Sequence, residues 1–168
     1  MRKGFALFAG FALTLGACSA PGDAQTEHSA ATQQSAVHAE SGLPLVPLTI
    51  ESGGRTHRFT VEYAASDENQ RKGLMFRTEL GPDEGMLFPN ATPQQRSFWM
   101  KNTVIPLDLI FIAPDRTIES IAADAVPYSL DPIPSQGAVV GVLELAGGRA
   151  AELGLSPGDA IDWRAPGQ

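Results

Sequence analysis

The sequence predicts a mainly β domain, folded as an antiparallel β-sandwich or a partly open barrel with two short helices. Three observations lead to this fold class. Apolar residues alternate at a period of two or gather in short runs, as they do in strands. Turns rich in Gly and Pro separate these runs, which favours antiparallel pairing of neighbours. Only two short stretches carry the residues that start and stop a helix.

A hairpin and a short helix are the first predicted elements. Residues 48–63 alternate apolar and polar side chains around Gly53-Gly54, a pair that can adopt the positive φ angles of a tight turn. The polar side chains after this turn, Glu62 among them, are expected to face water. Ser66 is a good N-cap for a helix, and Gly73 can end that helix.

The middle of the chain is expected to add buried strands. The large apolar side chains of "GLMF" (73–76) should enter the core, and "GMLFP" (85–89) should form a short buried strand. In "FWMK" (98–101), alternate side chains of an extended segment should face opposite sides. Residues 107–112 are predicted to form a strand that returns through a β-turn to pair with residues 117–123.

The last third of the domain is predicted to hold a loop, a strand, a helix and a closing strand. Three prolines make "VPYSLDPIPS" (126–135) an irregular loop. The run "AVVGVLEL" (138–145) is a buried strand. The second short helix lies in "GGRAAELG" (147–154), and "SPGDAIDW" (156–163) ends in the closing strand.

Composition limits the classes of partner. The 168 residues suit one domain with appendages, and 43% hydrophobic with 18% charged residues is typical of a globular protein. The formal net charge is −7 and no basic cluster is visible in the sequence. Because phosphate binding along a nucleic acid needs clustered Lys and Arg, we expect no nucleic-acid partner.

The N-terminus is typical of a secretory signal peptide, predicted to be residues 1–17. Arg2 and Lys3 form a short basic region, and an apolar stretch follows over residues 5–15. That stretch is too short to span a bilayer, which needs roughly 20 residues.

The end of this segment predicts a lipid anchor. "LGAC" (15–18) resembles the bacterial lipobox. The resemblance implies acylation of Cys18, cleavage after Ala17 and, since Ser19 rather than Asp follows, sorting to the outer membrane facing the periplasm. The alternative is an ordinary signal peptide whose Cys follows the cleavage site. As the only cysteine, Cys18 cannot form an internal disulfide or a multi-thiolate metal site.

Small polar residues dominate residues 18–42, which we predict to be a disordered, lipid-anchored tether. Such a segment cannot bury enough apolar surface to offset its ordering entropy. Residues 43–168 are predicted to form the single β-rich domain.

Four phrases of the domain resemble a known family. They are "RKGLMFR" (71–77), "GMLF" (85–88), "FWMKNTVIPLDLIFI" (98–112) and "VLELAGGRAAELGLSPGD" (142–159). Together they are similar to the family named domain of unknown function 192, over roughly residues 45–164. The resemblance implies a β-sandwich of jelly-roll type. It implies no activity, because the family has no established one.

Asp108 is the first candidate for a functional residue, since it interrupts an apolar run. A buried carboxylate is costly unless it is hydrogen-bonded or paired. In a structural role, Asp108 would accept N–H groups of the nearby turn or pair with a basic residue such as Lys101, Arg71 or Arg77. In a functional role, it would lie in a pocket for a polar ligand. We prefer the structural interpretation and keep both.

Trp99 is the second candidate. Phe98 and Met100 compete for the interior, so Trp99 can be partly exposed beside Lys101, where it would suit stacking on a carbohydrate ring. The predicted ligand-binding residues surround these two candidates: Arg71, Trp99, Lys101, Asn102, Thr103 and Asp108.

Catalytic motifs for nucleophilic triads, metalloproteases and phosphate-binding loops are absent from the sequence. The sequence therefore favours a non-catalytic lipoprotein of the bacterial cell envelope that binds a small polar ligand, a glycan or a partner protein. We expect no metal and no cofactor. The alternative is a hydrolase of an envelope polymer with Asp108 as general acid or base, paired with Glu84, Asp83 or Glu119.

Overall fold

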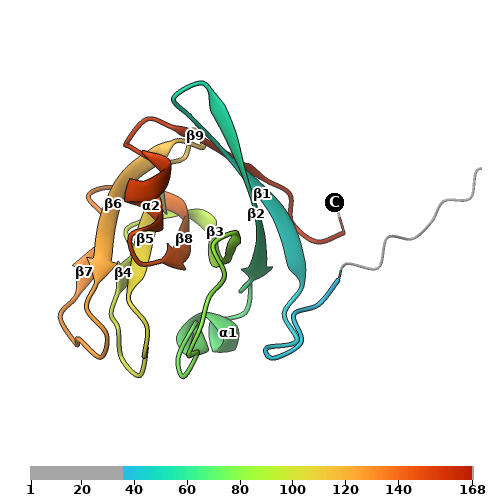
Figure 1. Ribbon diagram of the computed structural model, residues 1–168, viewed down its shortest axis with the longest axis vertical. Coiled ribbons are helices and arrows are strands. Elements are labelled where there is room, and N and C mark those ends of the chain that lie inside the picture. The colour runs from blue at the N-terminus through green and yellow to red at the C-terminus, as the bar shows by residue number, and fades with distance from the viewer. Residues whose placement is uncertain (1–35, 168) are drawn as a thin grey trace, which may run out of the picture. The chain divides into compact units, whose positions relative to one another are not determined.

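The computed structural model describes residues 36–167 as a β-rich domain (Figure 1). A seven-stranded sheet has the order β6-β5-β8-β3-β2-β1-β9, and β4 and β7 form a separate pair. The strands are β1 (Leu45–Ser52), β2 (Arg55–Tyr63), β3 (Glu84–Gln94), β4 (Ser97–Phe98), β5 (Leu107–Ile112), β6 (Ile118–Ala125), β7 (Ile133–Pro134), β8 (Val139–Ala146) and β9 (Ala160–Trp163). The helices α1 (Asp67–Lys72) and α2 (Arg149–Leu153) are short, and neither could cross a membrane.

The predicted hairpin is β1–β2. Ser52 pairs with Arg55, which leaves Gly53 and Gly54 as the two turn residues, with φ angles of 57° and 74°. Positive φ at both central positions is the geometry of a tight hairpin turn.

One strand pair departs from the antiparallel expectation. Strands β2 and β3 are parallel, with Thr60 opposite Glu84. A parallel pair needs a crossover connection, and α1 with its flanking loops provides it. The helix itself is as predicted, since the Ser66 hydroxyl accepts the N–H of Asn69 and Gly73 follows with a φ of 47°.

The sheet curves until its two edges meet. Thr117, just before β6, forms an isolated bridge to Ala160 in β9. The N–H of Ile118 also donates to the carbonyl of Asp159, and the N–H of Ile161 donates to the carbonyl of Arg116. Contact at this one bridge, without a full ladder, makes the sheet a partly open barrel, so the mainly β prediction is confirmed.

The two faces of the sheet pack separate cores. One cluster contains Ile110, Ile112 and Leu145 and packs against α2 through Ala150. The other contains Leu109, Phe111 and Val142 and lies under the segments around α1 and β4. Since neighbouring residues of a strand point to opposite faces, Asp108 belongs to the first face and Glu144 to the second.

The ordered domain begins before the predicted boundary at residue 43. Val37 forms a bridge with Pro44, and the N–H of Leu45 donates to the carbonyl of Ala36. Glu40 also lies 3.0 Å from the guanidinium of Arg77. These contacts order residues 36–42, which look like part of the tether by composition. The predicted signal peptide, Cys18 and tether residues 18–35 lie outside the described residues.

Two side chains of the predicted elements differ from the prediction in their burial. Glu62, predicted to face water, is buried, and it forms an ion pair with Arg77 at 3.0 Å. Phe76, predicted to enter the core, is 67% exposed because its backbone turns into the left-handed region, with a φ of 66°. Leu74 of the same phrase is buried as expected.

Candidate functional site

Asp108 is enclosed within the barrel, where it caps helix α2. Its side chain is fully buried. Its carboxylate accepts three backbone N–H groups, from Asp124 at 2.7 Å, from Gly148 at 3.0 Å and from Ala150 at 2.7 Å. Helix α2 begins at Gly148, which has no side chain to cap it, so Asp108 supplies the missing acceptor from another strand.

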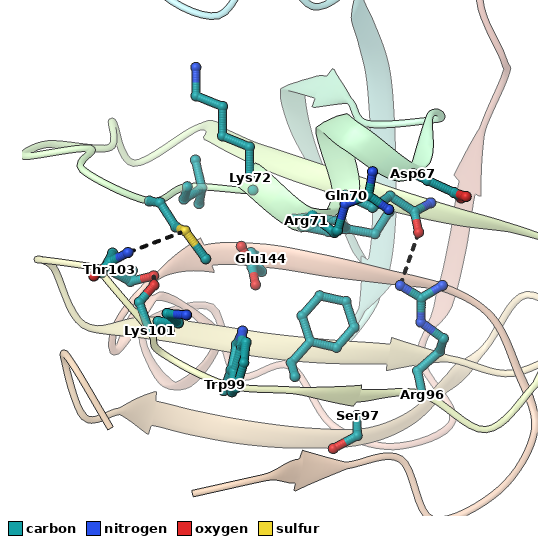
Figure 2. Close-up of a pocket in the computed structure, with 16 residues that line it drawn as sticks. Asp67, Gln70, Arg71, Lys72, Arg96, Ser97, Trp99, Lys101, Thr103 and Glu144 are labelled. Atoms are coloured by element: carbon teal, nitrogen blue, oxygen red, sulfur yellow. Dashed lines mark hydrogen bonds between the residues drawn. The ribbon is translucent and has the colours of Figure 1, made fainter. Parts of the chain in front are cut away.

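The main cleft of the described domain lies on the opposite face of the sheet. It has a volume of about 580 Å³. Its charged and aromatic lining defines what we call the basic cleft, and this lining comprises Asp67, Arg71, Lys72, Phe88, Arg96, Phe98, Trp99, Lys101 and Glu144. Figure 2 shows Glu144 between helix α1, which carries Arg71 and Lys72, and the segment that carries Trp99 and Lys101.

Basic residues are concentrated in this cleft. Of the ten Lys and Arg residues in the described range, four line it. No described carboxylate lies within 4.0 Å of these four side-chain cations. Arg77 and Arg149, outside the cleft, each contact two carboxylates. The cleft is therefore a local positive site in an acidic protein, which attracts anions.

Arg96 is held in place by neutral side chains. It donates to Asn90 Oδ1 at 2.6 Å and to Gln70 Oε1 at 3.0 Å, the second of which is drawn in Figure 2. Its guanidinium also lies 5.4 Å from the ring centroid of Phe98. Burial lowers the pKa of Arg96 from its usual value, against the opposing effect of Asp67, but an arginine stays charged in a protein.

Trp99 and Lys101 form one wall of the cleft. Trp99 is 51% exposed, and the Lys101 ammonium lies 5.2 Å from its ring centroid. The next two residues fix the turn. Asn102 has a φ of 56° and accepts the N–H of Phe76 through its carbonyl, while Thr103 is buried. The indole and the ammonium thus present a flat apolar surface next to a positive charge.

Glu144 is the buried carboxyl group of the cleft, whereas Asp67 is exposed. In the sheet it lies between Met86 on β3 and Leu109 on β5, both almost fully buried. No hydrogen bond to its carboxylate is found within the described domain. Burial raises its pKa from 4.5 to about 8. At neutral pH the group is therefore mostly protonated, and a neutral carboxyl can donate a hydrogen bond to an anion.

Five of the six predicted ligand-binding residues lie together. Arg71, Trp99, Lys101, Asn102 and Thr103 all line the basic cleft, whereas Asp108 faces the other side of the sheet. The structure therefore does not bring Asp108 together with the other five, because β5 places alternate side chains on opposite faces of the sheet.

Glu144 could have been found by the signal that singled out Asp108. It is likewise a carboxylate inside a buried apolar run, "VLEL" (142–145). Lys72 and Arg96 carry no comparable signal. Lys72 reaches the cleft through the crossover that holds α1, and Arg96, between β3 and β4, is oriented by its hydrogen bond to Gln70 of that helix.

The fold and the site together define a partly open β-barrel domain with a basic cleft on one face of its sheet. The chain belongs to the uncharacterised ACR family, named domain of unknown function 192, whose model matches residues 48–163. The predicted family is thereby confirmed. No curated protein matches the chain.

Two solved structures are similar to this domain. A crystal structure of a protein of unknown function from Novosphingobium aromaticivorans DSM 12444 is 50% identical, with a TM-score of 0.76 over 79% of this chain and 94% of that one. A crystal structure from Sinorhizobium meliloti 1021, provisionally described as a transcription regulator, is 42% identical, with a TM-score of 0.70 over 72% of this chain and 95% of that one.

Proposed function

We propose that the domain binds a small anionic ligand with a ring-shaped or apolar part, in the basic cleft. The main support for this proposal is that four basic side chains line one cleft without a carboxylate partner among the described residues. Charged side chains on a protein surface are usually solvated or paired, so several unpaired cations around one cavity favour an anion there.

The other walls of the cleft narrow the ligand class. Trp99 offers a half-exposed ring face for stacking, and Phe98 extends the apolar surface. Glu144, protonated at neutral pH, supplies a hydrogen-bond donor to a ligand oxygen. An acidic sugar combines a ring, several hydroxyl groups and a negative charge, so it satisfies all three features.

Hydrolysis with Asp108 as general acid or base has no support in this geometry. Asp108 is fully buried, and both of its oxygens accept backbone N–H groups. The cleft holds Glu144 and, at the start of α1, Asp67. Binding alone needs only the groups that the cleft presents, so it is the function we propose.

The affinity of the cleft is expected to depend mainly on the negative charge of the ligand and less on its ring. In isothermal titration at pH 7, glucuronate and glucose 6-phosphate should bind, while glucose should show no detectable heat of binding. Arg71→Gln and Lys101→Gln should each weaken binding about tenfold or more, since a hydrogen bond to a charged group is worth about 1.5–3 kcal/mol. Arg58→Gln, an exposed change outside the cleft, is the matched control.

Equal affinities of the acidic sugars and glucose, or cleft variants that bind like the Arg58→Gln control, would contradict the proposal.

The lipobox-like sequence supports a second part of the proposed role. We propose that Cys18 is acylated and anchors the protein in the bacterial envelope, facing the periplasm at the outer membrane. Several acyl chains hold a protein on a membrane far better than one chain does, because each buried methylene contributes about 0.8 kcal/mol.

Cys18→Ser is expected to move the protein from the membrane fraction to the soluble periplasmic fraction, or to block its processing. Cell fractionation with mass spectrometry of the mature N-terminus measures both results. A wild-type mass without added acyl groups, or a Cys18→Ser protein that fractionates like the wild type, would rule out the anchor.

A further inference from the structure

The exposed large hydrophobic side chains of the described domain gather on three neighbouring segments. Six such side chains are exposed, and all but Val37 belong to residues 76, 99 and 126–130. We call these five the apolar rim: Phe76, Trp99, Val126, Tyr128 and Leu130. Single exposed apolar residues are common on protein surfaces, but a contiguous group marks an interaction surface.

Backbone hydrogen bonds join the three segments into one surface. The N–H of Phe76 donates to the carbonyl of Asn102, and the N–H of Tyr128 donates to the carbonyl of Thr103. The N–H of Met100 donates to the carbonyl of Ser129. In Figure 1 the loops after α1, after β4 and before β7 project from the same end of the domain. The apolar rim is therefore held in place by the fold.

Two of the three aromatic residues of the apolar rim have unfavourable backbone conformations. Phe76 and Tyr128 have φ angles of 66° and 63°, in the left-handed region that bulky residues avoid. Packing does not explain their presence, because the two side chains are 67% and 60% exposed. A strained, exposed aromatic residue indicates a role outside the folded domain itself.

The charges around the apolar rim are positive where it meets the basic cleft. Residues 97–103 and 125–130 contain no acidic side chain, and their one charged residue is Lys101. Lys72 precedes Phe76 at the mouth of the cleft. Asp124 and Asp131 lie directly before and after the second of these segments.

We propose that the apolar rim docks on the surface of a bilayer containing anionic phospholipid. Trp and Tyr are suited to the boundary between headgroups and acyl chains, since each joins an apolar ring to a polar atom. The adjoining cations of the basic cleft meet the lipid phosphates.

Docking on a bilayer shares Trp99 and the cations of the basic cleft with binding of a small ligand, but the other rim residues distinguish the two proposals. Phe76, Tyr128 and Leu130 do not line the basic cleft. Changing them should leave the titration with glucuronate unchanged, so the two proposals can fail independently.

Tryptophan fluorescence of residues 19–168, which lack both the predicted signal peptide and the acyl anchor, tests the docking. The chain has two tryptophans, and Trp163 is buried, so Trp99 is the reporter and a Trp99→Phe variant gives the background. Vesicles of phosphatidylglycerol and phosphatidylcholine with brominated acyl chains should shift the Trp99 emission to the blue and quench it. Partition onto phosphatidylcholine alone should be about fivefold weaker or more.

Variants of the apolar rim complete the test. Phe76→Asn with Tyr128→Asn should weaken partition onto the anionic vesicles about tenfold or more. The double variant should melt at the same temperature as the wild type or higher, because Asn tolerates the left-handed conformation. Among the described residues, Val37 is the one exposed large hydrophobic outside the apolar rim, and Val37→Ser should leave partition unchanged.

Three results would overturn the docking proposal. The first is no quenching of Trp99 by brominated lipid. The second is a double variant that partitions like the wild type. The third is a dimer without vesicles in sedimentation equilibrium that the double variant dissociates, which would make a second copy of this chain the occupant of the surface.

Discussion

Asp108→Ala is expected to lower the melting temperature by roughly 10–20 °C, the largest effect of any single change proposed for this domain. The carboxylate accepts three buried N–H groups, and alanine leaves all three without an acceptor. A buried donor without an acceptor costs about 1–3 kcal/mol, so the total is roughly 3–6 kcal/mol after local relaxation. In a domain of this size, each kcal/mol corresponds to about 3–4 °C.

Asp108→Asn should lie between the wild type and Asp108→Ala. An amide oxygen can still accept the N–H groups of Asp124 and Gly148, but its NH₂ group then faces the N–H of Ala150, a second donor. Thermal melts at neutral pH measure the series, with the exposed Asp162→Ala as control. An Asp108→Ala protein that melts at or above the wild-type temperature would show that this carboxylate is retained for function at the expense of stability.

The wild type is expected to lose stability as pH rises, and Glu144→Gln is expected to be free of this loss. Since burial raises the pKa of Glu144 from 4.5 to about 8, the folded state holds one more proton than the unfolded state between these pH values. The free energy of unfolding therefore falls as pH increases from 4.5 to 8 and levels off above it. The loss is on the order of 3–5 kcal/mol if the site stays closed to water.

The comparison of melting temperatures at pH 5 and pH 9 measures this effect. The melting temperature of Glu144→Gln should rise relative to that of the wild type as pH increases. The melting temperature of Glu79→Gln, an exposed loop change, should follow that of the wild type. Binding of glucuronate to the wild type should also weaken above pH 8, because an ionised Glu144 repels an anion. A parallel pH dependence of the wild type and Glu144→Gln would refute the raised pKa.

Much of the fold follows from local signals in the sequence. Gly53-Gly54 specifies a hairpin because both positions need positive φ, and Ser66 with Gly73 marks the two ends of α1. The parallel pairing of β2 and β3 is not predictable in this way. It depends on where α1 packs, which no local pattern encodes. The same limit applies to Glu62, whose burial depends on a distant Arg77.

Part of the candidate site can likewise be predicted from local sequence signals, and part cannot. The phrase at residues 98–103 identifies Trp99, Lys101, Asn102 and Thr103 through its unusual residues, and the structure places them in one cleft. The choice between Asp108 and Glu144 requires knowledge of which face of the sheet is covered by helix α2. Both are single carboxylates in apolar strands, so sequence alone cannot assign one to the cap and the other to the cleft.

The pairing of the first strand with the last has a consequence for how the chain folds. Leu48 in β1 lies opposite Trp163 in β9. The two paired strands are therefore separated in sequence by almost the whole length of the domain. Contacts between residues so distant in sequence are slow to form, because the entropy of closing the intervening loop must be lost first. A chain growing from its N-terminus therefore leaves one side of β1 unpaired until β9 is complete, and the domain cannot become native before Trp163 has emerged.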